Sequence, residues 1–343
     1  MMGRKIAVLG TGANGASIGA DLTMAGEDVV FIEQWPAHVE AMRAHGVTIR
    51  TPSETKTVDV RTMHLCEVAT LRHKFDVVLM LMKAYDSRWA AQFIEPYVNS
   101  DALVAGIQNG MSIDDIATVV GSHRTMGCVI EITSAMFEPG IIERHSDPSR
   151  SWFAVGSIDS TTKGREEEIA GLLRNSGSVS IVDDIRAVKW MKIVSNSTTL
   201  ATTAIVGLPM IEAAGIPEMR RFMLQSGQEA LDATLMLGNP ILPIFGLTPN
   251  AVSEPSTVVE ALLDTLLEGF VLPKSITTIL QDWMKGRRSE VENINGLVAS
   301  THRDFGLRAP VNEAVVEVAH RIERGELEPG MANLGIMLDL ATR

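Results

Sequence analysis

Three polar side chains share one stripe of a predicted helix near residue 190. Lys189, Lys192 and Asn196 stand at positions i, i+3 and i+7 of the segment 189–196, a spacing that places them on one face. Reducing a ketone builds negative charge on the carbonyl oxygen, which needs hydrogen-bond donors and a proton. We expect Lys192 to donate that proton and Asn196 to bind the substrate. The alternative is a solvated lysine pair on an amphipathic helix.

A second group of candidate residues follows the first apolar run, at 6–9. The run leads into Gly10-Thr11-Gly12-Ala13-Asn14-Gly15, which has G-x-G-x-x-G spacing and opens a helical pattern. The glycines permit a tight turn and close approach of the backbone to a pyrophosphate, and a helix N-terminus attracts the anion. We expect these six residues to bind a dinucleotide. The alternative is a glycine turn with a structural role alone.

An acidic residue stands where the ribose of a dinucleotide would lie. Glu33 ends the second apolar run, at 29–32, about 20 residues beyond the glycine turn, where a carboxylate hydrogen-bonds the adenosine ribose. Because a carboxylate repels a 2′-phosphate, this position favours NAD over NADP. We expect Gln34 to contact the ribose as well, whereas Arg43 would support NADP. The alternative for Glu33 is a solvated glutamate at a strand end.

Two further polar residues follow buried apolar runs. Lys83 comes directly after the run at 77–82, and Asn109 follows the run at 102–107. Ligands of doubly wound sheets lie at the carboxyl ends of the strands, so both residues stand where a nicotinamide ring should project. We expect both to bind the cofactor and Asn109 also to contact the substrate. The alternatives are a surface lysine and a turn asparagine.

The elements that must position these residues divide into two kinds. The four apolar runs alternate with helical stretches and predict a parallel sheet covered on both faces. Later strand signals lie at 128–132, 140–143, 152–155 and 179–182, and the turn Glu138-Pro139-Gly140 predicts antiparallel pairing at the far side of this sheet. Helical patterns then dominate, at 185–206, 217–237, 258–270, 275–285, 290–303 and 311–324.

The predicted fold class is α/β, with a Rossmann-type doubly wound sheet followed by an all-α domain. We expect a dinucleotide-binding domain over residues 1–183 and a helical domain for substrate binding and dimerisation over 184–343, with a cleft between them. Residues 238–255 hold four prolines and little periodicity, which predicts a surface insertion.

The composition excludes several classes of protein. The chain has 343 residues, 45% of them apolar, which is enough for two domains. Its net charge of −12 argues against a nucleic-acid partner. The two cysteines, Cys66 and Cys128, fit a reduced compartment, and neither they nor the eight histidines show metal-ligand spacing. We therefore expect no metal.

Two stretches imitate membrane or export signals. The apolar run after Arg4 and Lys5 is broken by glycines, unlike a signal peptide. The uncharged stretch 193–211 contains several threonines, Gly207 and Pro209, which fits a buried helix better than a membrane span. We expect a cytoplasmic protein without a membrane partner.

Taken together, the motifs resemble the ketopantoate reductase (2-dehydropantoate 2-reductase) family over nearly the whole chain. The resemblance rests on the glycine turn, Met82-Lys83-Ala84, Gln108-Asn109-Gly110, Trp190-Met191-Lys192 with Asn196, the run Thr278-Ile279-Leu280-Gln281-Asp282, and the run Ser289-Glu290-Val291-Glu292-Asn293-Ile294-Asn295-Gly296. The last two runs are fairly specific to the family.

The resemblance implies reduction of a 2-oxo acid, ketopantoate, to a D-type 2-hydroxy acid in pantothenate biosynthesis, usually with NADPH. It implies that Lys192 is the general acid and that Asn196 binds the substrate. Glu290 would contact the substrate hydroxyl groups and order the site, and Thr278 stands where the family commonly has a substrate-binding serine. Without the resemblance to this family, Glu290 would be interpreted as an acidic residue at a helix start. Thr278 would be interpreted as a mid-helix threonine that bonds to a preceding carbonyl.

Departures from the family pattern favour a related activity. Glu33-Gln34 replaces an arginine that NADPH-specific members tend to carry, Leu200 stands where a second asparagine is common, and the region 238–270 is longer than in compact members. These favour an NAD-dependent 2-hydroxy acid dehydrogenase of the same family acting on another 2-oxo acid. An NAD(P)-sensing regulator and an opine dehydrogenase are two further functions that fit a glycine turn followed by helices. We expect a homodimer formed by the helical domain and this longer region.

Overall fold

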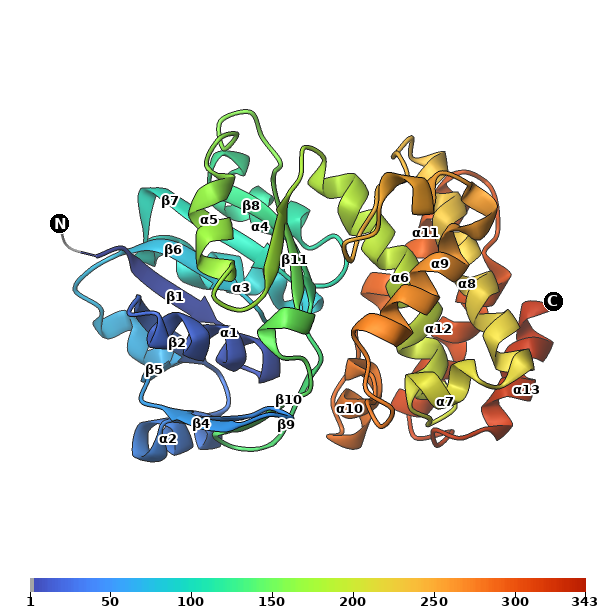
Figure 1. Ribbon diagram of the computed structural model, residues 1–343, viewed down its shortest axis with the longest axis horizontal. Coiled ribbons are helices and arrows are strands. Elements are labelled where there is room, and N and C mark those ends of the chain that lie inside the picture. The colour runs from blue at the N-terminus through green and yellow to red at the C-terminus, as the bar shows by residue number, and fades with distance from the viewer. Residues whose placement is uncertain (1–2) are drawn as a thin grey trace. The chain divides into compact units, whose positions relative to one another are not determined.

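The four apolar runs of the first half form adjacent parallel strands of one sheet (Figure 1). The computed structural model describes residues 3–343. The strands are β1 (Lys5–Leu9), β2 (Asp28–Glu33), β6 (Phe75–Met80) and β7 (Val98–Ile107), and β1 pairs with both β2 and β6. Each contains a continuous apolar run because both faces of the sheet are covered there.

Alternate residues of β1 show how the two faces are covered. Ile6 and Val8 pack in one buried cluster with Ile18 of α1, whereas Ala7 and Leu9 pack in another with Ile94 of α3. The helices of this unit are α1 (Ala13–Met24), α2 (Pro36–His45), α3 (Ser87–Ile94), α4 (Ile113–Val120) and α5 (Glu166–Leu173). The prediction of a doubly wound sheet is confirmed.

The eight-stranded sheet has the order β12-β11-β8-β7-β6-β1-β2-β5. Its later strands are β8 (Thr125–Glu131), β11 (Trp152–Ser157) and β12 (Ser178–Ile181), and β5 (Arg61–His64) forms the opposite edge. Pairing is parallel except between β8 and β11, which run antiparallel. Of the later strand signals, those at 128–132, 152–155 and 179–182 therefore belong to this sheet, whereas the one at 140–143 belongs to another.

A second sheet, of four strands, was not predicted. It has the order β4-β3-β10-β9 and consists of β3 (Val47–Arg50), β4 (Thr55–Val58), β9 (Ser134–Glu138) and β10 (Ile141–Arg144). The turn at Glu138-Pro139-Gly140 joins antiparallel strands as expected, but placing them at the far side of the main sheet was wrong. Pairing of β10 with β3 draws this hairpin away, and Gly140 O accepts from Thr48 N at 2.8 Å.

The second half is helical, and its own core lies among its helices (Figure 1). Contacts divide the chain into the units Met1–Ile185 and Arg186–Arg343. The helices are α6 (Ile185–Ile205), α7 (Met210–Ala214), α8 (Pro217–Met236), α9 (Pro255–Gly269), α10 (Thr278–Met284), α11 (Leu297–Asp304), α12 (Pro310–Glu323) and α13 (Ala332–Ala341). Helices α7 and α13 were not predicted.

Two predictions for the second half need correction. The helix expected over 290–303 begins with a π-helical turn, Glu292–Gly296, before α11. The stretch 238–255 contains only a short 3₁₀ turn, Pro249–Val252, but it is not wholly a surface insertion. Ile244 and Phe245 are buried, because this loop folds back onto the helical unit.

Short 3₁₀ turns connect the elements of the first unit. They lie at Leu65–Thr70, Ala84–Asp86, Glu95–Tyr97, Ser122–Arg124 and Pro148–Arg150.

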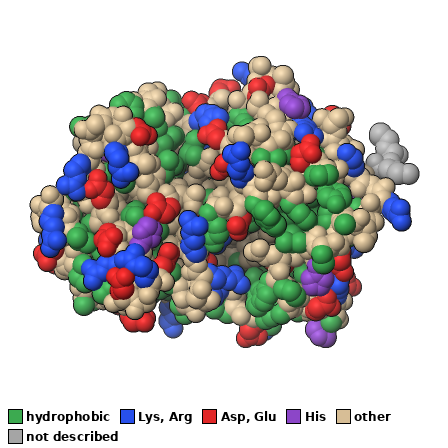
Figure 2. All heavy atoms as spheres, turned by 180° about the vertical axis from the view of Figure 1, so that it is seen from behind, with side chains coloured by type: hydrophobic (Ala, Val, Ile, Leu, Met, Phe, Trp, Pro, Cys, Tyr) green, Lys and Arg blue, Asp and Glu red, His purple; other side chains and the backbone are tan. Residues whose placement is uncertain are grey.

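No helix within residues 3–343 combines the length and apolarity needed to cross a membrane. On the face shown in Figure 2, acidic and basic side chains are interspersed. This face therefore lacks the single-signed basic stripe of a nucleic-acid-binding surface.

A buried arginine connects the two sheets of the first unit. Arg144 of β10 is 1% exposed, and its Nη1 lies 2.6 Å from Asp21 Oδ2 of α1. Its Nε donates to Ser146 O at 2.8 Å and its Nη2 to Ser176 O at 2.7 Å, just before β12. One guanidinium thus satisfies acceptors from three separate segments.

We expect Arg144→Met to lower the free energy of unfolding by about 3 kcal/mol, because it removes a buried cation and leaves the partly buried Asp21 carboxylate without its partner. Denaturant unfolding of the whole chain measures this. Arg50→Met is the matched control, since Arg50 forms an exposed ion pair with Glu143 on the same sheet, and such pairs contribute about 0–1 kcal/mol. Equal losses in the two variants would contradict the role of Arg144.

Candidate functional site

The glycine turn between β1 and α1 has the shape that a pyrophosphate needs. Gly10 has φ +88°, and a Cβ there would lie 2.6 Å from Met82 N. A Cβ on Gly15 would lie 2.1 Å from Gly10 O, whereas one on Gly12 would meet no atom within 4 Å. Gly10 and Gly15 are therefore required by the fold, and Gly12 leaves open space in front of the turn.

The N-terminus of α1 opens at the same place. Gly12 is its N-cap residue, and within the described chain no side chain caps this end and no acidic residue lies in the first turn. The N–H groups of the first turn and the helix dipole are therefore available to an anion. The residues present fit a dinucleotide whose pyrophosphate lies against Gly12 and Ala13.

Glu33 supports the glycine turn directly. Its Oε2 accepts hydrogen bonds from Thr11 N at 2.7 Å and Thr11 Oγ1 at 3.1 Å. Its Oε1 accepts from Gln34 N at 2.8 Å and Trp35 N at 3.0 Å. The residue is 6% exposed, so it is not the solvated glutamate of the alternative interpretation. Its contact with a ribose stays a prediction, as does that of the exposed Gln34.

His38 is a residue of this site that the sequence analysis missed. Its Nδ1 accepts from Gly140 N at 2.8 Å, so Nε2 carries the hydrogen and donates to Thr11 O at 2.9 Å. The ring thus holds the glycine turn against the hairpin of the second sheet. Nothing in the spacing of His38 signals this role, because Gly140 lies about a hundred residues further along the chain.

The strand-end residues gather at the same edge of the main sheet. Leu81 N donates to Leu9 O, which places the end of β6 beside the glycine turn. Gln108 Nε2 donates to Met82 O and to Ser87 Oγ, both at 2.9 Å. This amide ties the segment before Lys83 to the segment before Asn109. The structure therefore brings Lys83, Asn109 and the glycine turn together, as predicted for ligands of such sheets.

In the helical unit, Lys189, Lys192 and Asn196 are 2%, 7% and 2% exposed. The alternative of a solvated lysine pair is therefore wrong, because both lysines are buried. A buried ammonium group must be paired or hydrogen-bonded. The hydroxyl-rich stretch after Lys192 bonds mainly to its own helix: the hydroxyls of Ser197, Thr198, Thr199, Thr202 and Thr203 donate to carbonyls three or four residues back.

Two buried hydroxyls in this unit have no hydrogen-bond partner among the described residues. They are Ser195 Oγ and Thr278 Oγ1. Thr278 is the first residue of α10 rather than a mid-helix threonine, and its neighbour Thr277 donates to Leu200 O of α6 at 2.9 Å. Such orphaned groups suit a ligand. The sequence analysis missed Ser195, which looked like one more small residue of the helix.

Glu290 is also buried, at 4% exposed, and stands just before the π-helical turn. Asn295, within that turn, donates to Ser197 O of α6 at 3.4 Å and to Asn312 Oδ1 at 2.8 Å. The N-cap residue of α10, Thr277, and Asn295 of the π-helical turn thus both donate to α6, one to two turns beyond Lys192. π-Helical turns are frequent at functional sites.

A phenylalanine that the sequence analysis did not single out contacts the lysine. The ring centroid of Phe245, from the loop between α8 and α9, lies 4.8 Å from Lys192 Nζ. A ring face at this distance attracts an ammonium group.

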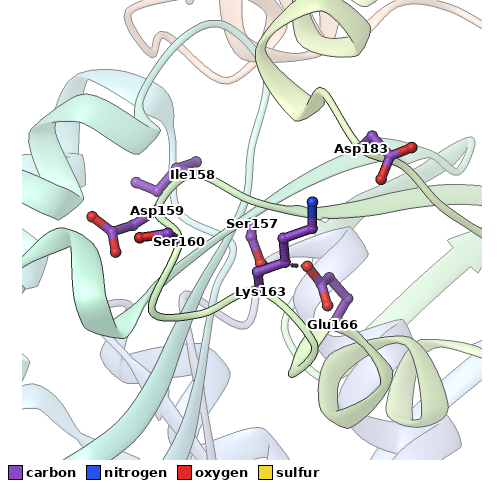
Figure 3. A pocket seen from close by; sticks show the side chains of 7 residues that line it. All are labelled: Ser157, Ile158, Asp159, Ser160, Lys163, Glu166 and Asp183. Carbon is purple, nitrogen blue, oxygen red and sulfur yellow. Dashed lines mark hydrogen bonds between the residues drawn. The ribbon is translucent and has the colours of Figure 1, made fainter.

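A polar hollow of about 230 Å³ lies elsewhere, at the end of β11 (Figure 3). It is lined by Ser157, Ile158, Asp159, Ser160, Lys163, Glu166 and Asp183. Glu166 accepts from Ser157 Oγ and Gly164 N, and Asp159 accepts from Thr161. These carboxylates therefore stabilise the loop that they belong to. The hollow contains none of the predicted site residues. Within residues 3–343, no cluster of three His, Cys, Asp or Glu side chains could hold a metal ion.

A glycine turn at the edge of a parallel sheet, joined to a helical unit with a buried lysine and asparagine, defines a dinucleotide-dependent oxidoreductase. The chain belongs to the ketopantoate reductase family. The family model "Ketopantoate reductase PanE/ApbA" matches residues 6–157, and its C-terminal counterpart matches residues 184–323. Members are NAD(P)H-binding oxidoreductases that act on CH–OH groups.

Individual relatives are similar at modest identity. The 2-dehydropantoate 2-reductase of Archaeoglobus fulgidus is 24% identical over 94% of this chain and 99% of its own. That of Pyrococcus horikoshii is 26% identical over 90% and 94%. Among solved structures, a ketopantoate reductase of Ralstonia eutropha superposes with TM-score 0.78 at 24% identity, covering 94% and 99%. D-mandelate dehydrogenase with NADH and anilino(oxo)acetate gives TM-score 0.83 at 18% identity, with the same coverage.

The environment of His38 makes stability depend on pH. Burial lowers the pKa of His38 below its ordinary value of about 6.5, so the unfolded chain takes up a proton that the folded chain refuses. This contribution to stability is complete above about pH 6.5 and is lost as the pH falls below it.

We expect the free energy of unfolding of His38→Gln to vary less between pH 7 and 5 than that of the parent. The difference in slope is at most about 1.4 kcal/mol per pH unit, the value for one proton. Thermal or denaturant unfolding at several pH values measures it. His45→Gln is the control, since His45 is an exposed residue of the same helix. Parallel curves for parent and His38→Gln would contradict the assignment.

Proposed function

We propose that the chain reduces a 2-oxo acid to a D-type 2-hydroxy acid, with Lys192 as the proton donor. The observation that carries the proposal is the burial of Lys192 and Asn196 on α6, with the start of α10 and the π-helical turn bonded to the same helix through Thr277 and Asn295. A buried ammonium beside hydrogen-bond donors is what a carbonyl oxygen needs as its charge develops.

In this proposal, four residues of the helical unit donate the proton or bind the substrate. Lys192 Nζ gives a proton to the carbonyl oxygen, and the Asn196 amide donates a second hydrogen bond to the substrate. Thr278 Oγ1 donates to the substrate carboxylate, and the Glu290 carboxylate accepts from a substrate hydroxyl. Residues 10–15, Lys83 and Asn109 would hold a reduced nicotinamide coenzyme, which would supply the hydride. Burial of Lys192 keeps water from competing for the proton.

Ketopantoate is the first candidate substrate, since the matching family and relatives carry that name. A different 2-oxo acid is the second candidate. It is favoured by Leu200, which replaces a polar residue on α6, and by the apolar ring of Phe245 over Lys192. The fold itself does not restrict the substrate to ketopantoate, because D-mandelate dehydrogenase shares it.

We expect Lys192→Ala to lower kcat by about 10²- to 10⁴-fold, the usual contribution of a positioned acid, while the affinity for the reduced coenzyme stays unchanged. Oxidation of NADH and NADPH with ketopantoate and other 2-oxo acids measures the rate. Lys274→Ala, at an exposed lysine of the same unit, is the control.

Equal turnover by parent and Lys192→Ala would remove the role of this lysine. A parent chain that binds the coenzyme but reduces no 2-oxo acid would instead favour the NAD(P)-sensing regulator. Consumption that requires an added amino acid would indicate an opine dehydrogenase.

For the coenzyme, we propose a preference for NAD. The carboxylate of Glu33 opposes a 2′-phosphate at the end of β2, and Arg43, which would favour NADP, is paired with Glu40 and Glu67. The same carboxylate also holds the glycine turn through Thr11. Its replacement should therefore affect both coenzymes.

We expect Glu33→Gln to weaken NADH binding by about tenfold, because an amide cannot accept all four hydrogen bonds and a lost buried bond costs about 1–3 kcal/mol. NADPH should lose less, so the ratio of the two affinities shifts toward NADPH. Fluorescence titration of both coenzymes measures this. An unchanged ratio would mean that Glu33 does not read the ribose, and an unchanged NADH affinity would mean that it does not support the turn.

We further propose a homodimer that works in the cytoplasm. Two large apolar side chains, Leu235 and Leu237, are exposed at the end of α8, which is surface that a second copy can cover. Cys66 and Cys128 are both free thiols, as a reducing compartment keeps them. Sedimentation equilibrium giving the mass of a single chain would contradict the dimer.

A further inference from the structure

The loop between α8 and α9 carries an aromatic ring onto the lysine of the helical unit. Phe245 is 6% exposed, and its ring centroid lies 4.8 Å from Lys192 Nζ. A second ring, that of Phe270 at the end of α9, lies 5.3 Å from it at an angle of 45°. We call these two rings the Phe245–Phe270 pair. The pair belongs to the stretch 238–270.

The backbone of Phe245 is held in an unfavourable conformation. Its φ is +60°, the one positive value at a non-glycine residue within the described chain. A bulky residue keeps this conformation only where its surroundings hold it there, which is common at ligand sites. In this conformation the ring lies against Lys192. The contact therefore coincides with a strained backbone at Phe245.

The distance to Lys192 limits what lies beside the ring when a substrate is bound. A carbonyl oxygen that takes a proton from Nζ lies about 2.8 Å from it, so the first atom of the group attached to the carbonyl carbon lies within about 5 Å. That is the same shell that the Phe245 ring occupies. A flanking group that lies on the same side of Nζ as the ring, the carboxylate or the side chain, therefore comes within contact distance of the ring.

The charge on the two groups indicates which of them lies against the Phe245 ring. The face of an aromatic ring carries partial negative charge, which repels a carboxylate, and rings pair favourably with other rings. The carboxylate is better placed toward hydroxyl donors such as Thr278 Oγ1, which has no other partner among the described residues.

We propose that the Phe245–Phe270 pair is the wall that receives the side chain of the 2-oxo acid, and that it selects a flat apolar group, an aryl ring, over a branched hydroxylated chain. This inference rests on the proposed 2-oxo acid reduction and names its substrate class. The competing possibility is that Phe245 is a cap that must leave Lys192 before any substrate enters.

The test compares specificity rather than rate alone. We would measure kcat/KM of the full chain for phenylglyoxylate, ketopantoate and 3-methyl-2-oxobutanoate, in the parent and in Phe245→Leu and Phe245→Tyr. The parent should prefer phenylglyoxylate. Phe245→Leu should lower the ratio of phenylglyoxylate to 3-methyl-2-oxobutanoate by about tenfold, mainly through KM, because a ring contact is lost. Phe245→Tyr keeps the ring and should keep the ratio within about twofold.

Two further variants complete the design. Phe305→Leu removes an exposed ring from the same unit and should leave the ratio unchanged. Phe270→Leu should shift the ratio in the same direction as Phe245→Leu but by less, and it carries the test if Phe245→Leu does not fold.

Several results would overturn the proposal. A ratio unchanged in both Phe245→Leu and Phe270→Leu would show that the pair does not contact the substrate side chain. Faster turnover of every substrate by Phe245→Leu would identify a cap. A parent that reduces aliphatic but not aryl 2-oxo acids would overturn this inference alone, whereas a parent that reduces no 2-oxo acid would overturn the proposed function itself.

Discussion

The burial of two lysines on α6 is the constraint around which the helical unit is arranged. Taking an ammonium group out of water costs several kcal/mol unless acceptors or an aromatic face replace the water. Lys189 and Lys192 are nevertheless less than a tenth exposed. Three elements distant in sequence meet this helix: the loop of Phe245 at Lys192, the start of α10 through Thr277, and the π-helical turn through Asn295.

The same helix shows how a polar sequence can be buried. The hydroxyls that follow Lys192 mostly return to carbonyls one turn back, which satisfies them without outside partners. Ser195 is the exception in this stretch, with a buried oxygen that bonds to no other described atom. A helix that satisfies its other hydroxyls internally leaves Ser195 Oγ, three residues beyond Lys192, for a ligand.

Local patterns predicted the elements that depend on local signals. Continuous apolar runs identified β1, β2, β6 and β7, since a strand covered on both faces needs apolar residues throughout. The same logic, with the glycine turn, gave the fold class, which the structure and the comparisons confirm. Short mixed strands such as β4, whose first three residues are exposed, carry no such pattern, so the second sheet was missed.

The site was predictable where residue type and spacing carry chemistry. Lys192, Asn196 and the glycine turn were singled out on those grounds, although the roles assigned to them remain predictions. His38, Phe245 and Ser195 were missed for a common reason. The role of His38 depends on Gly140, and that of Phe245 on Lys192, which are both distant in sequence. Ser195 stands out only because its buried hydroxyl has no partner among the described residues. No window of sequence contains such partners.

The position of Glu33 has an evolutionary consequence. One carboxylate holds the glycine turn through Thr11, and under the proposed coenzyme preference the same charge would oppose an extra phosphate. A lineage that exchanged it for a basic residue would acquire a new coenzyme contact and lose a structural support in the same step. Such a lineage would have to hold its loop by other means, so coenzyme choice and loop architecture should diverge together rather than separately.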